Sequence, residues 1–199
     1  MAHKVRSSRL KYVVFILLIL CVGGITLLRV SLRTDPPILP IPPPLVVEGV
    51  VVIGKSGPAL SNWVYSRSIR ISRDTCKKIV EETIKYQKPL LLLSIMEVES
   101  HFVPTATSSK NAMGLMQVMP GIWDKDLIAK GIIKERRDLY DIEPSIKAGN
   151  YVFNLCLVRS KGDVEKALEY YLGGKDGVYV KRILTSLSTL YILTDMRLH

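Results

Sequence analysis

Two neighbouring stretches decide the fold of this chain: residues 95–104 read Ile-Met-Glu-Val-Glu-Ser-His-Phe-Val-Pro, and residues 114–120 read Gly-Leu-Met-Gln-Val-Met-Pro. Apolar residues in and just before the first stretch recur at helical spacing, which predicts a helix over residues 90–102. The residues on one face of this helix are Leu92, Ile95, Met96, Glu99 and Phe102. Glu99 therefore shares a face with large apolar side chains, whereas Glu97 points to another side.

Glu99 is a candidate general acid because of this placement. A carboxylic acid among apolar groups loses the hydration of its charged form, which raises its pKa and keeps it protonated closer to neutral pH. Such a group can donate a proton to a leaving oxygen. The alternative from the helix alone is a buried glutamate that is paired with a basic side chain and has no catalytic role.

Four blocks of sequence around Glu99 resemble one known family in their order and spacing. They are Glu99-Ser100 with Pro104 behind it, residues 114–120, Ile146 to Gly149, and Ala-Leu-Glu-Tyr-Tyr-Leu-Gly-Gly at residues 167–174, with Ser108 and Ala112 between the first two. The family is that of the soluble-lytic-transglycosylase-like (SLT) lytic transglycosylases, in the lysozyme-like superfamily. The resemblance covers about residues 73 to 190, and four ordered blocks are far more specific than any single one.

The resemblance implies an all-α, lysozyme-like domain that cleaves the bond between N-acetylmuramic acid and N-acetylglucosamine in peptidoglycan. Members of the family use a single Glu as acid and then as base, and the C6 hydroxyl of the muramic acid attacks its own C1. The expected product is a 1,6-anhydromuramyl end. No metal or organic cofactor is expected for this reaction.

Carried over residue by residue, the resemblance implies that Glu99 is the catalytic residue and that four residues bind substrate: Ser108, Gln117, Met119 and Tyr171. Ser108 would hydrogen-bond the substrate beside Glu99, Gln117 and Met119 would shape the floor of the cleft, and Tyr171 would lie near the acid. Each has a structural alternative. The Ser108 hydroxyl can cap backbone groups, and a lone Tyr171 is often a half-buried core aromatic.

The chain departs from the family pattern at two places. Leu172 stands where the family has Asn after the late Tyr, and this removes a polar group near the expected cleft. The Tyr expected three residues after Gly149 is Val152, with Tyr151 one position out of step. These changes affect the expected substrate contacts more than they affect the acid.

Hydrolysis of a β-1,4 glycosidic bond ordinarily needs two carboxylates, and the sequence offers only one candidate. Glu97 lies about 200° around the helix from Glu99, outside any shared cleft. Two competing functions therefore stay open. One is a lysozyme-like hydrolase with a second carboxylate that the sequence does not identify, and the other is a non-catalytic scaffold that binds glycan strands in an envelope complex.

Residues 1–33 are expected to form a cytoplasmic stub and a membrane anchor. Residues 12–28 are uncharged and just long enough to span a bilayer. Basic residues are in excess before this span, which predicts a cytoplasmic N-terminus and a catalytic domain in the periplasm or outside the cell. The run lacks the small residues that precede a signal cleavage site, so an uncleaved anchor in a bacterial inner membrane is favoured over secretion.

Residues 34–71 are expected to be a spacer, because six prolines crowd positions 36–44 and favour an extended chain. Residues 45–53 are rich in Val and Ile and read as a short extended segment. The domain is then assigned to residues 72–199, with Ser72 as a helix N-cap. Further helices are expected at residues 72–87, 121–130, 144–159, 164–172 and 178–193, with a loop at 103–111.

The formal charge of +10 does not indicate nucleic-acid binding. Six of the 28 basic residues lie in positions 1–33, which hold no acids, and the remaining 22 face 18 acidic residues, a balance of +4. That balance suits a polymer that carries carboxylates. Cys76 and Cys156 could form one disulfide outside the cytoplasm or remain buried free thiols, and neither has the Cys and His neighbours of a zinc site.

Overall fold

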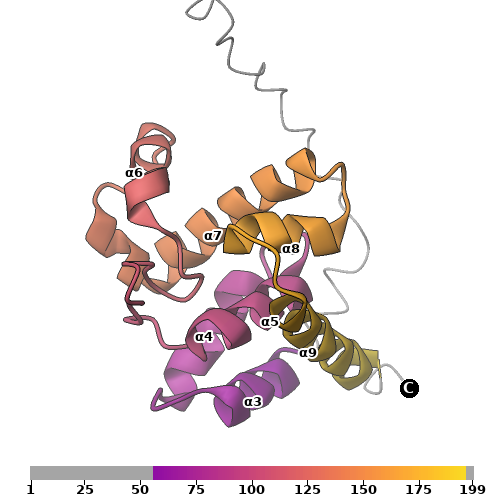
Figure 1. Ribbon diagram of the computed structural model, residues 1–199. Helices are drawn as coiled ribbons and strands as arrows, with labels where there is room; N and C mark the ends of the chain where they lie inside the picture. Colours follow the sequence, from indigo (N-terminus) through magenta and orange to yellow (C-terminus); the bar gives the residue numbers. More distant parts are fainter. Residues whose placement is uncertain (1–55, 196–199) are drawn as a thin grey trace, which may run out of the picture. The chain divides into compact units, whose positions relative to one another are not determined.

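Helix α5, Pro89–Ser100, carries Glu99 and is packed against α9 (Gly177–Asp195), α4 (Arg73–Thr83) and α3 (Gly57–Arg67) in the computed structural model, which describes residues 56–195 (Figure 1). Every residue of α5 from Pro89 to Met96 is buried. The prediction of a single buried face is therefore incomplete, because the first two turns of this helix are buried on all sides.

The described residues are all-helical, as expected. After α5 the chain forms α6 (Pro120–Ala129), a 3-10 helix η1 (Arg136–Tyr140), α7 (Ile142–Arg159), α8 (Val164–Leu172) and α9. Helices α7 and α8 pack together, as do α3 and α4 (Figure 1). The only strand-like pairing in this part of the chain is two isolated bridges that join Met113 to Thr107 and to Val118.

Two predicted helix starts are confirmed. The Ser72 hydroxyl caps α4 by accepting a hydrogen bond from the backbone N–H of Thr75 at 3.1 Å. Pro89 occupies the first turn of α5, where its missing N–H costs nothing. The helices expected after the loop at 103–111 appear as α6, α7, α8 and α9, with ends within two residues of the predicted ones.

The end of α5 is a correction. The helix stops at Ser100, because His101 and Phe102 adopt left-handed backbone angles, with φ of +49° and +60°. This turn ends the helix two residues before the predicted boundary. Phe102 is nevertheless fully buried, so the chain turns inward rather than continuing along the predicted face.

Helix α3 was not predicted from the sequence, where its residues fell in the expected spacer of residues 34–71. Pro58 lies in the first turn of α3, where proline starts a helix rather than ending one. Leu60 and Val64 are fully buried, and the ring of Trp63 packs edge-on against Phe102 with centroids 5.8 Å apart. The packed helical region therefore begins before residue 72.

The predicted membrane span at residues 12–28, the proline-rich stretch and the extended segment at 45–53 lie outside the described residues. None of the helices between residues 56 and 195 has both the length and the apolar character that crossing a bilayer requires. Cys76 and Cys156 are both buried and free, which answers the open question of a disulfide in favour of two thiols.

Gly114 should be the least replaceable glycine of the described domain. Its φ is +76°, and a Cβ built on it would lie 1.8 Å from the backbone oxygen of Leu139. Gly131 has a similar φ of +63° but open space around it. We expect Gly131→Ala to cost about 1–2 kcal/mol of unfolding free energy from backbone strain alone, and Gly114→Ala to cost clearly more, as measured by urea unfolding.

The two substitutions form a matched pair, since both add a methyl group to a left-handed glycine. Equal losses of stability would mean that the backbone of η1 moves aside from Gly114 at no cost, and would contradict the close approach that we describe.

Candidate active site

Glu99 lies in the last turn of α5. It is half-buried, as are Glu97 and Val98, whereas the preceding residues of the helix are fully enclosed. Tyr179, near the start of α9, donates a hydrogen bond from its hydroxyl to Glu99 Oε1 at 2.6 Å. The two residues are 80 positions apart in the sequence. The packing of α9 against α5 is therefore what places a hydrogen-bond donor on the carboxylate.

The pKa of Glu99 is raised above its ordinary value, and the largest cause is burial, which disfavours the charged form. The hydrogen bond from Tyr179 and the positive charge of Arg182 act in the opposite direction and lower it. No carboxylate contributes to this balance among the described residues. The alternative of a buried glutamate paired with a basic side chain is thus only partly confirmed. Arg182 is nearby, but its effect on the pKa of Glu99 is smaller than that of burial.

Tyr171 of α8 lies close enough to Glu99 for the carboxylate charge to act on it. Burial first, and then Glu99, raises the pKa of Tyr171 well above its ordinary value. Its hydroxyl donates to the backbone oxygen of Met116 at 2.7 Å, and its ring packs edge-on against Phe153. The structure thus places Tyr171 near Glu99. The hydrogen bond from its hydroxyl to Met116 joins α8 to the loop at residues 114–117.

Ser100 fixes this loop to the end of the Glu99 helix. Its buried hydroxyl lies 2.8 Å from the backbone oxygen of Leu115 and 3.1 Å from that of Met96. Leu115 and Met116 are fully buried. A Cβ on Gly149 of α7 would lie 2.4 Å from the Met116 side chain, so α7 approaches the loop closely. The loop is therefore held by α5, α7 and α8.

Gln117 joins two parts of the same loop region. Its backbone has a left-handed φ of +47°, and its side-chain Nε2 donates to the backbone oxygens of Gly114 at 2.9 Å and Ala106 at 3.2 Å. This bonding ties residues 103–111 to residues 114–117. Gln117 thus has a structural role in holding the two segments together. Its contact with substrate stays a prediction.

Ser108 and Met119 also have backbone tasks in the structure. The Ser108 hydroxyl accepts hydrogen bonds from the backbone N–H groups of Ala112 at 3.0 Å and Lys110 at 3.2 Å. Met119 precedes α6, and its carbonyl accepts from Ile122 and Trp123 in the first turn. Both side chains are half-buried, and neither is hydrogen-bonded to Glu99 in the described part of the chain.

The departures from the family pattern fall at defined places. Leu172 lies at the end of α8 and is 41% exposed. Val152 is buried, while the hydroxyl of Tyr151 donates to Asp126 Oδ2 at 2.6 Å and so joins α7 to α6. Burial and Asp126 raise the pKa of Tyr151 to about 12. Tyr151 therefore has a partner of its own, which is not Glu99.

Several other carboxylates of the described region already have partners. Glu97 is 17% exposed and lies 3.6 Å from Arg67, and Asp124 accepts from Arg136 Nε at 2.9 Å. Glu97 is turned away from Glu99 as predicted, toward α3. Residues 56–195 contain no group of three His, Cys, Asp or Glu side chains arranged to hold a metal ion.

Tyr179 is the site residue that reading the sequence missed. It falls inside the helix predicted at residues 178–193, and on periodicity alone it is one more apolar position of that helix. Burial and the Glu99 carboxylate raise its pKa, so its hydroxyl remains a hydrogen-bond donor. Only the packing of α9 against α5 identifies this tyrosine.

A family model described as "Transglycosylase SLT domain" matches residues 78–181, a range that includes Glu99 and Tyr179. Similar curated proteins are named "Membrane-bound lytic murein transglycosylase C". The one from Actinobacillus pleuropneumoniae serotype 5b (strain L20) is 40% identical over 75 residues, which is 37% of this chain and 20% of that protein.

The protein of the same name from Glaesserella parasuis serovar 5 (strain SH0165) is 47% identical over 62 residues, 30% of this chain and 17% of the relative, and so is that from Haemophilus influenzae (strain PittGG). The similarity thus spans a fifth or less of the length of these curated relatives. No solved structure matches the chain.

Tyr179→Phe should raise the pKa of Glu99 further, because it removes a hydrogen bond that favours the charged carboxylate. The measurement is a titration of the Glu99 carboxyl carbon by nuclear magnetic resonance. Tyr191→Phe, at an exposed position of the same helix, is the matched control. A Glu99 pKa that is unchanged or lower in Tyr179→Phe would contradict the hydrogen bond.

Glu99→Gln should stabilise the fold at neutral pH. The pKa of Glu99 is higher in the folded state than in the unfolded state. The contribution of this group to wild-type stability is therefore complete below the ordinary pKa of 4.5, and it is lost as pH rises through the folded-state pKa. The variant does not incur this loss, at about 1.4 kcal/mol per unit of pKa difference. Urea unfolding at pH 4 and pH 7 should therefore show the variant gaining over wild type only at the higher pH.

The exposed Glu165 supplies the control for this comparison, since Glu165→Gln removes a carboxylate from the surface of α8. We expect it to change the unfolding free energy by no more than about 0.5 kcal/mol. A Glu99→Gln variant that is less stable than wild type at pH 7 would mean that the charged carboxylate supports the fold.

Proposed function

The chain belongs to the transglycosylase SLT domain family, and from this premise we propose that it is a peptidoglycan lytic transglycosylase with Glu99 as its single acid and base. The observation that carries the proposal is the environment of Glu99: burial raises its pKa, Tyr179 orients it, and no carboxylate acts on it among the described residues. A lone carboxyl with a raised pKa suits proton donation to a leaving oxygen.

In the proposed reaction the Glu99 proton goes to the oxygen that leaves C1 of N-acetylmuramic acid, and the C1–oxygen bond breaks. The C6 hydroxyl of the same sugar then forms the new bond to C1 and gives its proton to the Glu99 carboxylate. The acid is regenerated, and no water is consumed. Because the attack is intramolecular, the protein needs chiefly to hold the sugar in position.

Tyr179 has a positioning role in this proposal. Its hydroxyl holds Oε1 of Glu99, which leaves Oε2 as the oxygen available to the sugar. The hydrogen bond also favours the carboxylate form, which is required for the second proton transfer. Tyr171 and Met116 support the loop beside the acid through their mutual hydrogen bond.

The proposed location is the outer face of a bacterial inner membrane. The support is the apolar, uncharged run at residues 12–28 with its excess of basic residues on the N-terminal side. The relatives described above carry "membrane-bound" and "murein" in their names, in agreement with this proposal. The six prolines at positions 36–44 favour an extended chain, which suits a spacer between this run and the helical domain.

The deciding experiment is mass spectrometry of the soluble products that the full chain, purified in detergent, releases from isolated sacculi. Wild type and the control Glu165→Gln should release muropeptides with 1,6-anhydro ends, and Glu99→Gln should release none, because an amide cannot donate the proton that the leaving oxygen needs.

Each other result has a definite meaning. Reducing muramic acid ends would identify a hydrolase and require a second carboxylate. Binding to sacculi without any soluble product, equal for wild type and Glu99→Gln, would identify a glycan-binding scaffold. Either of these results would overturn the proposed function.

A further inference from the structure

Helix α6 buries little apolar surface and makes several polar contacts with its neighbours. Of its ten residues only Pro120 and Leu127 are buried. Ile122 is 63% exposed and Ile128 is 46% exposed, so two large apolar side chains of this helix contact solvent. Apolar burial therefore contributes less to the position of α6 than it does for the enclosed α5, and the polar contacts of α6 matter correspondingly more.

Tyr151 of α7 makes two of these contacts. Its hydroxyl donates to Asp126 Oδ2 at 2.6 Å, and Nζ of Lys130 lies 5.5 Å from the centroid of its ring. Asp126 and Lys130 are four residues apart, so they lie on one face of α6, and Tyr151 contacts both. Tyr151 is half-buried, and a hydrogen bond to a charged group is stronger where water is partly excluded.

The contact between Asp124 and Arg136 of η1 is the weaker restraint on α6. Arg136 donates to Asp124 Oδ2 from Nε at 2.9 Å and from Nη2 at 2.5 Å, but its side chain is 61% exposed. Ion pairs at the surface contribute little to stability, because water screens the charges and the long side chain loses conformational freedom. The hydrogen bond of Tyr151 is therefore the contact best suited to fix the orientation of α6.

The first turn of α6 follows the loop that is held against the end of α5. The chain runs from residues 114–117 to Met119, the N-cap residue, and directly into the helix. Met119, Ile122 and Trp123 have i, i+3, i+4 spacing, so they lie on one face, which continues to Asp126. Ile122 is exposed, and Met119 and Trp123 are half-buried. We call these three residues the apolar start of α6.

We propose that Tyr151 is a positioning residue for glycan binding, which orients α6 so that its apolar start contacts the sugar strand held at Glu99. This inference rests on the proposed function, because the strand is the substrate of that reaction. Ligand sites are lined mainly by apolar and aromatic side chains. Because Asp126 shares a face with the apolar start, a rotation of α6 about its axis turns both together, and the contact with Tyr151 opposes that rotation.

This role also accounts for a departure from the family pattern. Val152 occupies the position at which the family has a tyrosine, and it is buried, whereas the tyrosine of this chain stands one residue earlier. One residue along a helix corresponds to a turn of about 100° around its axis. The side chain of Tyr151 therefore reaches Asp126 on α6, in a direction that the buried Val152 does not share.

The test is the binding and cleavage of soluble, uncrosslinked glycan strands by the full chain in detergent. Tyr151→Phe keeps the ring beside Lys130 and removes the hydrogen bond to Asp126. We expect KM to rise by about tenfold, the equivalent of one hydrogen bond to a charged group. We expect kcat to stay unchanged, because Glu99 and Tyr179 lie on other helices. The dissociation constant, measured with Glu99→Gln in place so that no strand is cut, should rise by the same factor.

Further variants show whether the hydrogen bond itself is responsible. Asp126→Ala removes it from the other side and should reproduce the effect, and the double variant with Tyr151→Phe should be no weaker than either alone. Asp126→Asn keeps an acceptor for the hydroxyl and should retain most of the wild-type affinity. Tyr170→Phe is the matched control: its ring is also half-buried, with Arg159 at 4.2 Å, but its hydroxyl has no hydrogen-bond partner among residues 56–195.

Fluorine NMR of the chain labelled with fluorotryptophan separates a change in α6 from a loss of the fold. The chain has two tryptophans. Trp123 reports on α6, and Trp63, which packs against Phe102, is the internal control. Tyr151→Phe should shift the Trp123 signal and leave the Trp63 signal in place. If both signals shift, the fold of that variant is altered, and the comparison of Asp126→Ala with Asp126→Asn decides instead.

Several results would overturn the inference. They are a wild-type KM and dissociation constant in Tyr151→Phe, equal losses in Tyr151→Phe and Tyr170→Phe, and a loss of affinity without any shift of the Trp123 signal. The inference and the proposed function fail separately. Anhydro products with an unchanged KM in Tyr151→Phe would refute this inference alone. Strands that Tyr151→Phe binds more weakly, but that wild type never cleaves, would refute the proposed function alone.

Discussion

The hydrogen bond between Tyr179 and Glu99 is the contact on which the arrangement of this domain depends. A carboxyl group at the end of an apolar helix is costly to bury, and the cost is acceptable only if a partner satisfies it. Tyr179 supplies that partner from the far end of the chain, through the packing of α9 on α5. The hydrogen bond lowers the pKa of Glu99, but burial raises it and has the larger effect. Stability and chemistry are therefore coupled at one carboxylate.

A second constraint is the close approach of backbone around residues 114–117. Gly114 lies against the backbone of Leu139, Ser100 holds Leu115, and Tyr171 holds Met116. Each of these contacts uses a backbone carbonyl oxygen, so the loop is fixed by its main chain rather than by the identity of its outward side chains. These contacts hold the loop against the end of the Glu99 helix.

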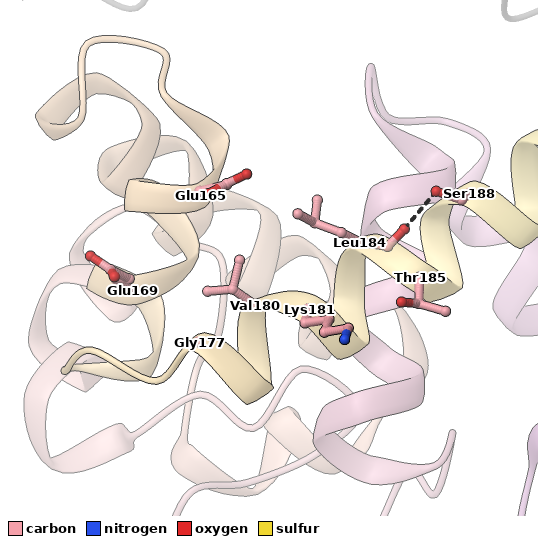
Figure 2. A pocket seen from close by; sticks show the side chains of 8 residues that line it. All are labelled: Glu165, Glu169, Gly177, Val180, Lys181, Leu184, Thr185 and Ser188. Carbon is pink, nitrogen blue, oxygen red and sulfur yellow. Dashed lines mark hydrogen bonds between the residues drawn. The ribbon is translucent and has the colours of Figure 1, made fainter.

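The charged side chains around α9 differ between two of its faces. Glu165 and Glu169 of α8 border a groove beside α9 (Figure 2), and Arg67, Lys181 and Arg182 border a second groove between α9 and the end of α5. Arg182 lines the second groove, and its positive charge also lowers the pKa of Glu99.

The sequence by itself determined the helical class, the start of α4 at Ser72 and the start of α5 at Pro89, and it singled out Glu99 as the candidate acid, because caps, prolines and periodicity act over a few neighbouring residues. It did not reveal α3, whose residues it assigned to the spacer, because the packing of Trp63 against Phe102 is a contact between segments distant in the sequence. Nor did it reveal Tyr179, or the backbone tasks of Ser108 and Gln117. These features were decided by the tertiary structure alone, because each depends on which distant segments pack together, and local sequence patterns carry no record of a partner 80 residues away.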